Sequence, residues 1–294
     1  MKNENKIQRR DLIKTLAVGA TTAFIGSGFT KLDAQEVSNQ LKGNINHSLC
    51  QWCYPDLSLE ELCEVAKEFG LMGIDLIEPS GWDTLKKHKL VSTMCNGAEI
   101  SLTEGFNDPQ YHPMLIENYT KHIKLVAEAG FTNLICFSGN KRGMDDETGL
   151  QNCVQGLQQI LPLAEKLGVV IQMELFNSKV DHPDYMCDNS AWGIELCKRL
   201  DSPNFKLLYD IYHMQISEGD IIRTITDNHQ YFGHYHTAGV PGRNEINDTQ
   251  ELFYPAIMKA IVASGYEGVV AQEFIPKNEN PLESLKESIL ICDV

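Results

Sequence analysis

Residues 150–174 read LQNCVQGLQQILPLAEKLGVVIQME, and this stretch contains the unit that decides the fold. Apolar residues recur at helical spacing as far as Leu167, and Gly168 is suited to the left-handed conformation that ends many helices. The apolar run that follows has the length of a buried strand and ends on a carboxylate, Glu174. A helix joined to a buried strand by a short turn is typical of a parallel β/α fold.

The same alternation extends in both directions, from a polar linker that ends near Gly43 to the last residues of the chain. Eight units without a break in composition favour a (β/α)8 TIM barrel, a single α/β domain over residues 44–294, over an open doubly wound sheet. A capping box at Ser58 and Glu61 is expected to begin the first helix. The expected strands are 45–49, 73–77, 90–95, 133–137, 169–174, 205–210, 231–236 and 268–273. The clearest helical stretches are 58–70, 114–129, 150–167, 220–226, 253–263 and 282–291.

The composition excludes several classes of partner. The 25 basic and 40 acidic residues give a net charge of −15, which repels phosphate backbones and anionic membrane surfaces. Neither nucleic acid nor a membrane is therefore an expected partner, and without a run of about 18 uncharged apolar residues the mature protein should be soluble. The nine cysteines are scattered and odd in number, which predicts buried thiols rather than a disulfide framework. The Cys50 and Cys53 pair has no second pair at zinc-ribbon distance.

The first 34 residues are predicted to be a targeting segment. Arg9 and Arg10 stand within QRRDLIK, and a modestly apolar stretch at 15–28 follows, with small residues up to Ala34. This pattern resembles a twin-arginine export signal joined to the barrel by a linker at 35–43. Export, to a periplasm for example, is the expectation. A cytoplasmic protein, in which the arginine pair is a chance feature of a flexible terminus, is the alternative.

Four metal-binding side chains end the last four expected strands: Glu174, Asp210, His236 and Glu273. In a TIM barrel the carboxyl-terminal ends of neighbouring strands meet on one face, so these side chains are expected to converge on one ion. Three carboxylates and an imidazole, without a thiolate, suit Mn²⁺, Mg²⁺ or Co²⁺ at least as well as Zn²⁺. A lone carboxylate is more often a helix cap or a surface ion pair; the repetition at four strand ends is what favours a metal.

Three short motifs accompany these residues in a fixed order: DIYH at 210–213, HYH at 234–236 and PGR at 241–243. Their combination resembles the xylose isomerase-like TIM-barrel family, in particular its branch of hydroxypyruvate isomerases and ketose 3-epimerases, from about Ile45 to the C-terminus. The resemblance implies that Glu174 and Glu273 are metal ligands that also act as general acid and base.

The same resemblance assigns the other site residues. Asp210 and His236 complete the metal shell, His213 hydrogen-bonds a substrate oxygen, and Arg243 grips the distal oxygens of the substrate. His234 is left between a structural and a catalytic role. Two further assignments stay open. Glu78 is expected either to bind substrate hydroxyls or to accept a hydrogen bond from a neighbouring backbone N–H. Four aromatic residues are expected to form either a pocket wall or part of the core, namely Trp52, Tyr54, Trp82 and Phe106.

The resemblance implies a metal-dependent isomerase. Moving a carbonyl and hydroxyl pair requires removal of a carbon-bound proton and stabilisation of an enediolate, which two carboxylates and a divalent ion supply. Hydroxypyruvate isomerase, which makes tartronate semialdehyde, is the nearest match, and the PGRNE run at 241–245 favours it. His236 stands where those enzymes often carry glutamine and ketose epimerases carry histidine. A ketose 3-epimerase or a 3-keto-sugar-processing enzyme is therefore the alternative, ahead of a noncatalytic sugar-binding protein. The expected partner is a small hydroxy-carbonyl or sugar substrate, and homo-oligomerisation is left open.

Overall fold

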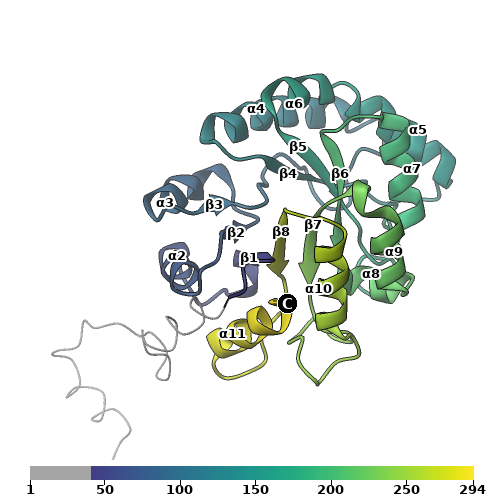
Figure 1. The fold of residues 1–294 in the computed structure, drawn as a ribbon. Coiled ribbons are helices and arrows are strands. Elements are labelled where there is room, and N and C mark those ends of the chain that lie inside the picture. Colours follow the sequence, from purple (N-terminus) through teal and green to yellow (C-terminus); the bar gives the residue numbers. More distant parts are fainter. Residues whose placement is uncertain (1–40) are drawn as a thin grey trace, which may run out of the picture.

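The computed structural model describes residues 41–294, which form an eight-stranded parallel sheet with helices outside it (Figure 1). The predicted export signal and most of the predicted linker lie outside the described residues. Neighbouring strands follow the order β3-β2-β1-β8-β7-β6-β5-β4. The strands are β1 (Asn46–Cys50), β2 (Gly73–Asp75), β3 (Val91–Ser92), β4 (Asn133–Cys136), β5 (Val170–Glu174), β6 (Phe205–Asp210), β7 (Phe232–Thr237) and β8 (Val269–Gln272).

A single residue beyond the end of β3, Cys95, nearly closes the sheet into a barrel. Cys95 forms isolated parallel bridges with Ile77 on one side and Leu134 on the other. Its backbone N–H donates to Asn133 O at 2.9 Å, and its carbonyl accepts from Ile135 N at 3.0 Å. Since every strand pair is parallel and the two edges meet here, the prediction of a TIM barrel is confirmed.

Helices follow most strands and form the outer layer (Figure 1). A helix was expected over residues 150–167, but the structure has two in this region. Pro162 explains the break, because its ring prevents a continuous helical backbone through this point. The helices α3, α7 and α8 were not assigned from the sequence. The full set is α2 (Leu59–Glu68), α3 (Trp82–Lys87), α4 (His112–Ala129), α5 (Asp146–Leu157), α6 (Leu161–Leu167), α7 (Ser190–Leu200), α8 (Ile211–Ser217), α9 (Ile221–Asn228), α10 (Tyr254–Ala263) and α11 (Pro281–Cys292), with 3-10 turns at Gln51–Cys53, Pro79–Gly81 and His229–Tyr231.

The predicted helix ends have the expected geometry. The Ser58 side chain accepts from Glu61 N at 3.2 Å, and the Glu61 carboxylate accepts from Ser58 N at 2.8 Å, which completes the capping box of α2. Gly130 and Gly168 end α4 and α6 in the left-handed region, with φ of 80° and 71°. Within residues 41–294, no helix combines the length and the apolar character that crossing a membrane requires.

The core explains several residues that the sequence left open. Tyr54, Trp82 and Phe106 are buried in it, whereas Trp52 is 43% exposed. All nine cysteines are buried and unpaired, as expected for small apolar side chains rather than for disulfides. Of the four aromatic residues, only Trp52 is therefore free to line the mouth of the barrel.

Candidate active site

The structure brings the four predicted ligands together at the carboxyl-terminal end of the strands. Glu174 ends β5, Asp210 ends β6, His236 lies in β7 and Glu273 directly follows β8. Asp210 and His236 are direct partners in the β6–β7 ladder. All four side chains are buried, and one ligand atom from each lies within 4.8 Å of every other. Neighbouring parallel strands produce this convergence, since their ends share one rim.

Two cationic groups lie among the three carboxylates. His236 Nδ1 is 2.8 Å from Glu273 Oε2 and 3.4 Å from Glu174 Oε1. Arg243 Nη2 is 2.6 Å from the same Glu273 oxygen and 3.4 Å from Asp210 Oδ2. Three carboxyl groups and two basic groups therefore meet at a point from which water is largely excluded, and Coulomb interactions are strong there.

The donor set fits a divalent cation. Despite these short contacts, Glu174 Oε1 and His236 Nδ1 make no hydrogen bond of good geometry, although buried polar atoms are nearly always satisfied. Both are atoms that coordinate metals in proteins, and the two other carboxylates add hard oxygen donors. An ion bound by these four residues would satisfy the unpartnered atoms and neutralise the excess negative charge.

Burial and neighbouring charges shift the pKa values of these groups in different directions. Burial raises the pKa of Asp210 to about 8 and also raises the pKa of Glu174. Burial acts in the same direction on Glu273, but His236 and Arg243 outweigh it and hold the pKa of this carboxyl well below its usual range. For His236, burial opposes the charge, yet Glu273 and other neighbours raise the pKa well above its ordinary value. The metal-free cluster thus retains protons that a divalent ion would replace.

Arg243 is held at the rim by backbone and aromatic contacts. It adopts a φ of 59°, which is uncommon for a residue with a side chain, and its carbonyl accepts from Ile275 N at 2.7 Å. The guanidinium carbon lies 5.1 Å from the ring centre of Trp52 and 5.5 Å from that of Tyr212. Trp52 also donates its indole N–H to Glu273 Oε1 at 2.9 Å. These contacts aim the guanidinium at the carboxylate cluster.

His213 presents one ring nitrogen to the same cluster. Asp210 caps α8, and its Oδ1 accepts from His213 N at 3.1 Å. The Asn177 side-chain amide donates to His213 Nδ1 at 2.7 Å, so the proton of the neutral ring lies on Nε2, 3.6 Å from Asp210 Oδ2. Burial lowers the pKa of His213 well below its ordinary value, which keeps the ring neutral. A neutral N–H donor therefore faces the site and has no partner of its own.

Asp75 belongs to this site but was not predicted from the sequence, whereas Glu78, three residues further on, was considered as a substrate-binding residue. The second strand was expected to continue to Ile77, which would have put Asp75 in its interior and Glu78 at its end. Instead β2 ends at Asp75, whose carboxylate contacts His234 and His236, and Glu78 is exposed. The signal was available, because Asp75 is a further carboxylate within an apolar strand.

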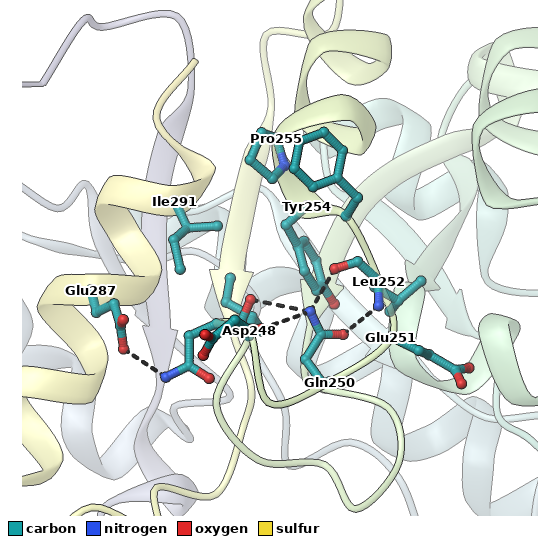
Figure 2. A pocket seen from close by; sticks show the side chains of 11 residues that line it. Asp248, Gln250, Glu251, Leu252, Tyr254, Pro255, Glu287 and Ile291 are labelled. Atoms are coloured by element: carbon teal, nitrogen blue, oxygen red, sulfur yellow. Dashed lines mark hydrogen bonds between the residues drawn. The ribbon is translucent and has the colours of Figure 1, made fainter.

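A surface pocket lies beside the carboxyl-terminal helix α11 (Figure 2). Its volume is about 510 Å³, and the segment 246–255 supplies most of its lining, with Glu287 and Ile291 from α11. The Gln250 side chain is bound to its own loop, donating to Leu252 O at 2.5 Å and accepting from Leu252 N at 2.6 Å. None of the predicted site residues lines this pocket.

Known relatives share the sequence pattern over part of the chain. A 2-oxo-tetronate isomerase from Cupriavidus necator is 34% identical over 110 residues, which are 37% of this chain and 42% of that protein. The chain thus spans less than half the length of this relative. The hydroxypyruvate isomerase of Escherichia coli is 26% identical over 225 residues, which are 73% of this chain and 86% of that enzyme.

Structural comparison and a family match extend further along the chain. The solved structure of a 3-keto-D-glucoside 4-epimerase from E. coli superposes with a TM-score of 0.71 at 19% identity, covering 84% of this chain and 98% of that one, which supports the fold. The model of the family described as "Xylose isomerase-like TIM barrel" matches residues 63–291. The chain therefore belongs to the xylose isomerase-like TIM-barrel family.

Proposed function

We propose that the protein is a divalent-metal-dependent isomerase that shifts a carbonyl and hydroxyl pair in a small hydroxy-carbonyl acid. Conversion of hydroxypyruvate to tartronate semialdehyde is the nearest named reaction. The observation that carries the proposal is the buried convergence of Glu174, Asp210, His236 and Glu273, with the Arg243 guanidinium at its edge. The names of the two isomerase relatives support the same reaction class.

The four converging residues would hold the ion, whose Lewis acidity would favour loss of a proton from the hydroxyl-bearing carbon next to the carbonyl. Glu174 and Glu273 are the proton carriers in this proposal. They stand three strands apart in the sheet order, on β5 and after β8, so they reach the site from different parts of the rim. One carboxylate takes the carbon-bound proton, and the other, already protonated, donates its proton to the neighbouring carbon, while the hydroxyl proton passes to the former carbonyl oxygen.

Arg243 and His213 bind and orient the substrate in this proposal. The Arg243 side chain is 15% exposed, so the guanidinium can be reached from solvent while it stays within 3.4 Å of Asp210. A planar guanidinium pairs well with a substrate carboxylate, which favours an acidic substrate. The His213 Nε2–H, which lacks a partner, donates to a substrate oxygen.

A ketose 3-epimerase is the second candidate, and His236 is the observation that favours it. The family resemblance associates histidine at this position with ketose epimerases and glutamine with hydroxypyruvate isomerases. The same two carboxylates would serve an epimerase, because proton removal and return then occur at a single carbon. The position at which the substrate is held decides between the reactions.

Hydrogen exchange tests the proposal directly. The protein is incubated in D₂O with Mn²⁺ or Mg²⁺ and, separately, with hydroxypyruvate, 2-oxo-tetronate and a panel of ketoses, and carbon-bound deuterium is measured by NMR. We expect exchange in an acidic substrate and its loss after chelation or in Glu273→Gln. Exchange confined to ketoses would favour the epimerase, and no exchange in any compound would refute an isomerase of either kind. Asp293→Asn, at the opposite end of the barrel, serves as the control.

A further inference from the structure

Asp75 joins two histidines below the candidate metal ligands. Its Oδ2 lies 2.6 Å from His234 Nε2 and 3.1 Å from His236 Nε2. All three side chains are completely buried. The two histidines are two residues apart on β7 and therefore face the same side of the strand. One carboxylate oxygen thus receives both imidazoles.

The other oxygen of Asp75 is anchored from the first and third strands. Thr93, the residue after β3, donates its hydroxyl to Asp75 Oδ1. The Thr93 hydroxyl in turn lies 2.7 Å from Ser48 Oγ on β1. Because both carboxylate oxygens are engaged, the carboxylate cannot rotate without losing buried hydrogen bonds, each of which is costly to leave unmade.

This arrangement determines which nitrogen of His236 faces the ligands. Nε2 is directed at Asp75, so Nδ1 is directed at Glu174 and Glu273, at 3.4 and 2.8 Å. A neutral imidazole carries its proton on one nitrogen and a lone pair on the other. A carboxylate at Nε2 keeps the proton there and leaves the Nδ1 lone pair available to a metal, as second-shell carboxylates do in many metal sites.

We propose that Asp75 is a positioning residue of the metal centre, holding the ring of His236 with Nδ1 directed at the ion. The inference rests on the proposed function in requiring that the four-ligand cluster binds a divalent ion. His234 Nε2 contacts the same Asp75 oxygen from another side. The ring centres of His234 and His236 are 5.2 Å apart, and the ring planes are inclined at 84°. His234 therefore supports Asp75 rather than acting on the substrate.

The same three side chains are also close enough to be considered a metal site by themselves. The hydrogen bonds among them argue against this. At 2.6 and 3.1 Å the two Nε2 atoms already engage Asp75 Oδ2, so the atoms that an ion would require are used. The proposal thus predicts one tightly bound ion per chain.

The test measures metal affinity without substrate. Mn²⁺ affinity is determined by competition with a chelator for the unmodified protein, Asp75→Asn, His236→Gln and the double variant. Asp75→Asn should bind Mn²⁺ about 10- to 100-fold more weakly, the usual effect of losing such a partner. In the His236→Gln protein, adding Asp75→Asn should weaken Mn²⁺ binding by less than about 2-fold further, since Asp75 acts through His236.

Asp293→Asn is the matched control. Asp293 is also buried beside a histidine, with Oδ1 3.8 Å from His47 Nε2, but it lies after α11 and contacts none of the four ligands. Its replacement should leave Mn²⁺ affinity unchanged. An unchanged affinity in Asp75→Asn, a full additive loss in the double variant, or two tightly bound ions per chain would each overturn the proposal.

A second variant covers the case in which Asp75→Asn does not fold. Thr93→Val removes one hydrogen bond to Asp75 and keeps both histidines, so Mn²⁺ affinity should fall by about 2- to 10-fold, the usual range for one hydrogen bond. An unchanged affinity in a folded Thr93→Val protein would overturn the role of Asp75. Since no substrate is present, these results are independent of the hydrogen-exchange test of the isomerase.

Discussion

Both ends of the barrel contain a buried histidine beside an aspartate, with different consequences. At the mouth, Asp75 lies 2.6 and 3.1 Å from two histidines of β7. Near the start of β1, His47 Nε2 lies 3.8 Å from Asp293 Oδ1, beyond hydrogen-bond distance. The other Asp293 oxygen accepts from Lys42 N at 2.8 Å, which ties the start of the described chain to its end.

The two places differ in the charge that each histidine carries. Burial lowers the pKa of His47 to about 4, and the single carboxylate of Asp293 offsets this only in part. His236 is buried as deeply, but Glu273, with Asp75 and further neighbours, raises its pKa well above the ordinary value. Burial by itself therefore favours a neutral ring, and the number of nearby acidic groups decides whether the ring is charged.

The largest effect is expected from neutralising a carboxylate at the mouth. Glu174→Gln or Glu273→Gln should each lower kcat by about 10²- to 10⁴-fold with the fold retained, because a proton carrier is lost. Turnover of the substrate identified by hydrogen exchange, together with circular dichroism, measures this. Asp293→Asn should leave kcat within about 2-fold, as expected for a surface or structural carboxylate remote from the chemistry. Near-native turnover in either glutamine variant would contradict the two-carboxylate mechanism.

Removal of a ligand should affect metal binding next. Asp210→Ala should weaken Mn²⁺ binding by at least about 100-fold, since second-shell changes alone cost about 10- to 100-fold. Excess Mn²⁺ should therefore restore part of the activity. Titration of the chelated protein with Mn²⁺, followed by activity and bound metal, provides the measurement. Full activity after exhaustive chelation would exclude a metal-dependent reaction.

Replacement of Arg243, the cationic side chain at the rim, should raise KM for acidic substrates more than for neutral ones. Arg243→Ala should raise KM for hydroxypyruvate about 10- to 100-fold, corresponding to one lost hydrogen bond between charged groups. KM for an uncharged ketose should change far less. Initial rates over a range of substrate concentrations test this, and an equal KM for hydroxypyruvate in both proteins would argue against an acidic substrate.

The smallest effect is expected from protonation of His47, beside Asp293 near the start of β1. It should lower the free energy of unfolding and leave activity unchanged. The folded-state pKa of His47, about 4, lies below its unfolded value, so the unfolded chain binds the proton first as the pH falls. Stability from this group is complete above about pH 7 and declines as the pH falls, by about 2 kcal/mol at pH 5 and about 3 kcal/mol at pH 4. Urea denaturation at pH 7 and pH 5 measures it. In His47→Gln this part of the pH dependence should disappear, and an unchanged slope would refute it.

Local signals predicted most of the architecture. The β6 boundaries, Phe205–Asp210, agree with the sequence to the residue, and the α2 capping box and the glycine ends of two helices were all visible in short patterns. These features depend on residues within one turn or one strand, so the sequence contains them directly.

The errors occurred where tertiary contacts override local preference. Leu76 adopts a φ of 60°, and its N–H donates to Met94 O at 2.8 Å, which ends β2 two residues early. A leucine rarely takes this conformation, so no local pattern announces it. The expected strand therefore ran through to Ile77, which put Asp75 in its interior instead of at its end.

The sequence by itself determined the order of strands and helices and the residue types that end β5 to β8. Parallel connectivity then places those ends on one rim, so the convergence of the four predicted ligands could be predicted without coordinates. The pairing of Asp75 with His236, 161 residues apart, was decided only in the tertiary structure, because the barrel curves β2 toward β7 across β1 and β8. The protonation of the site residues was also decided by the tertiary structure, because a pKa depends on burial and on neighbours that distant segments supply.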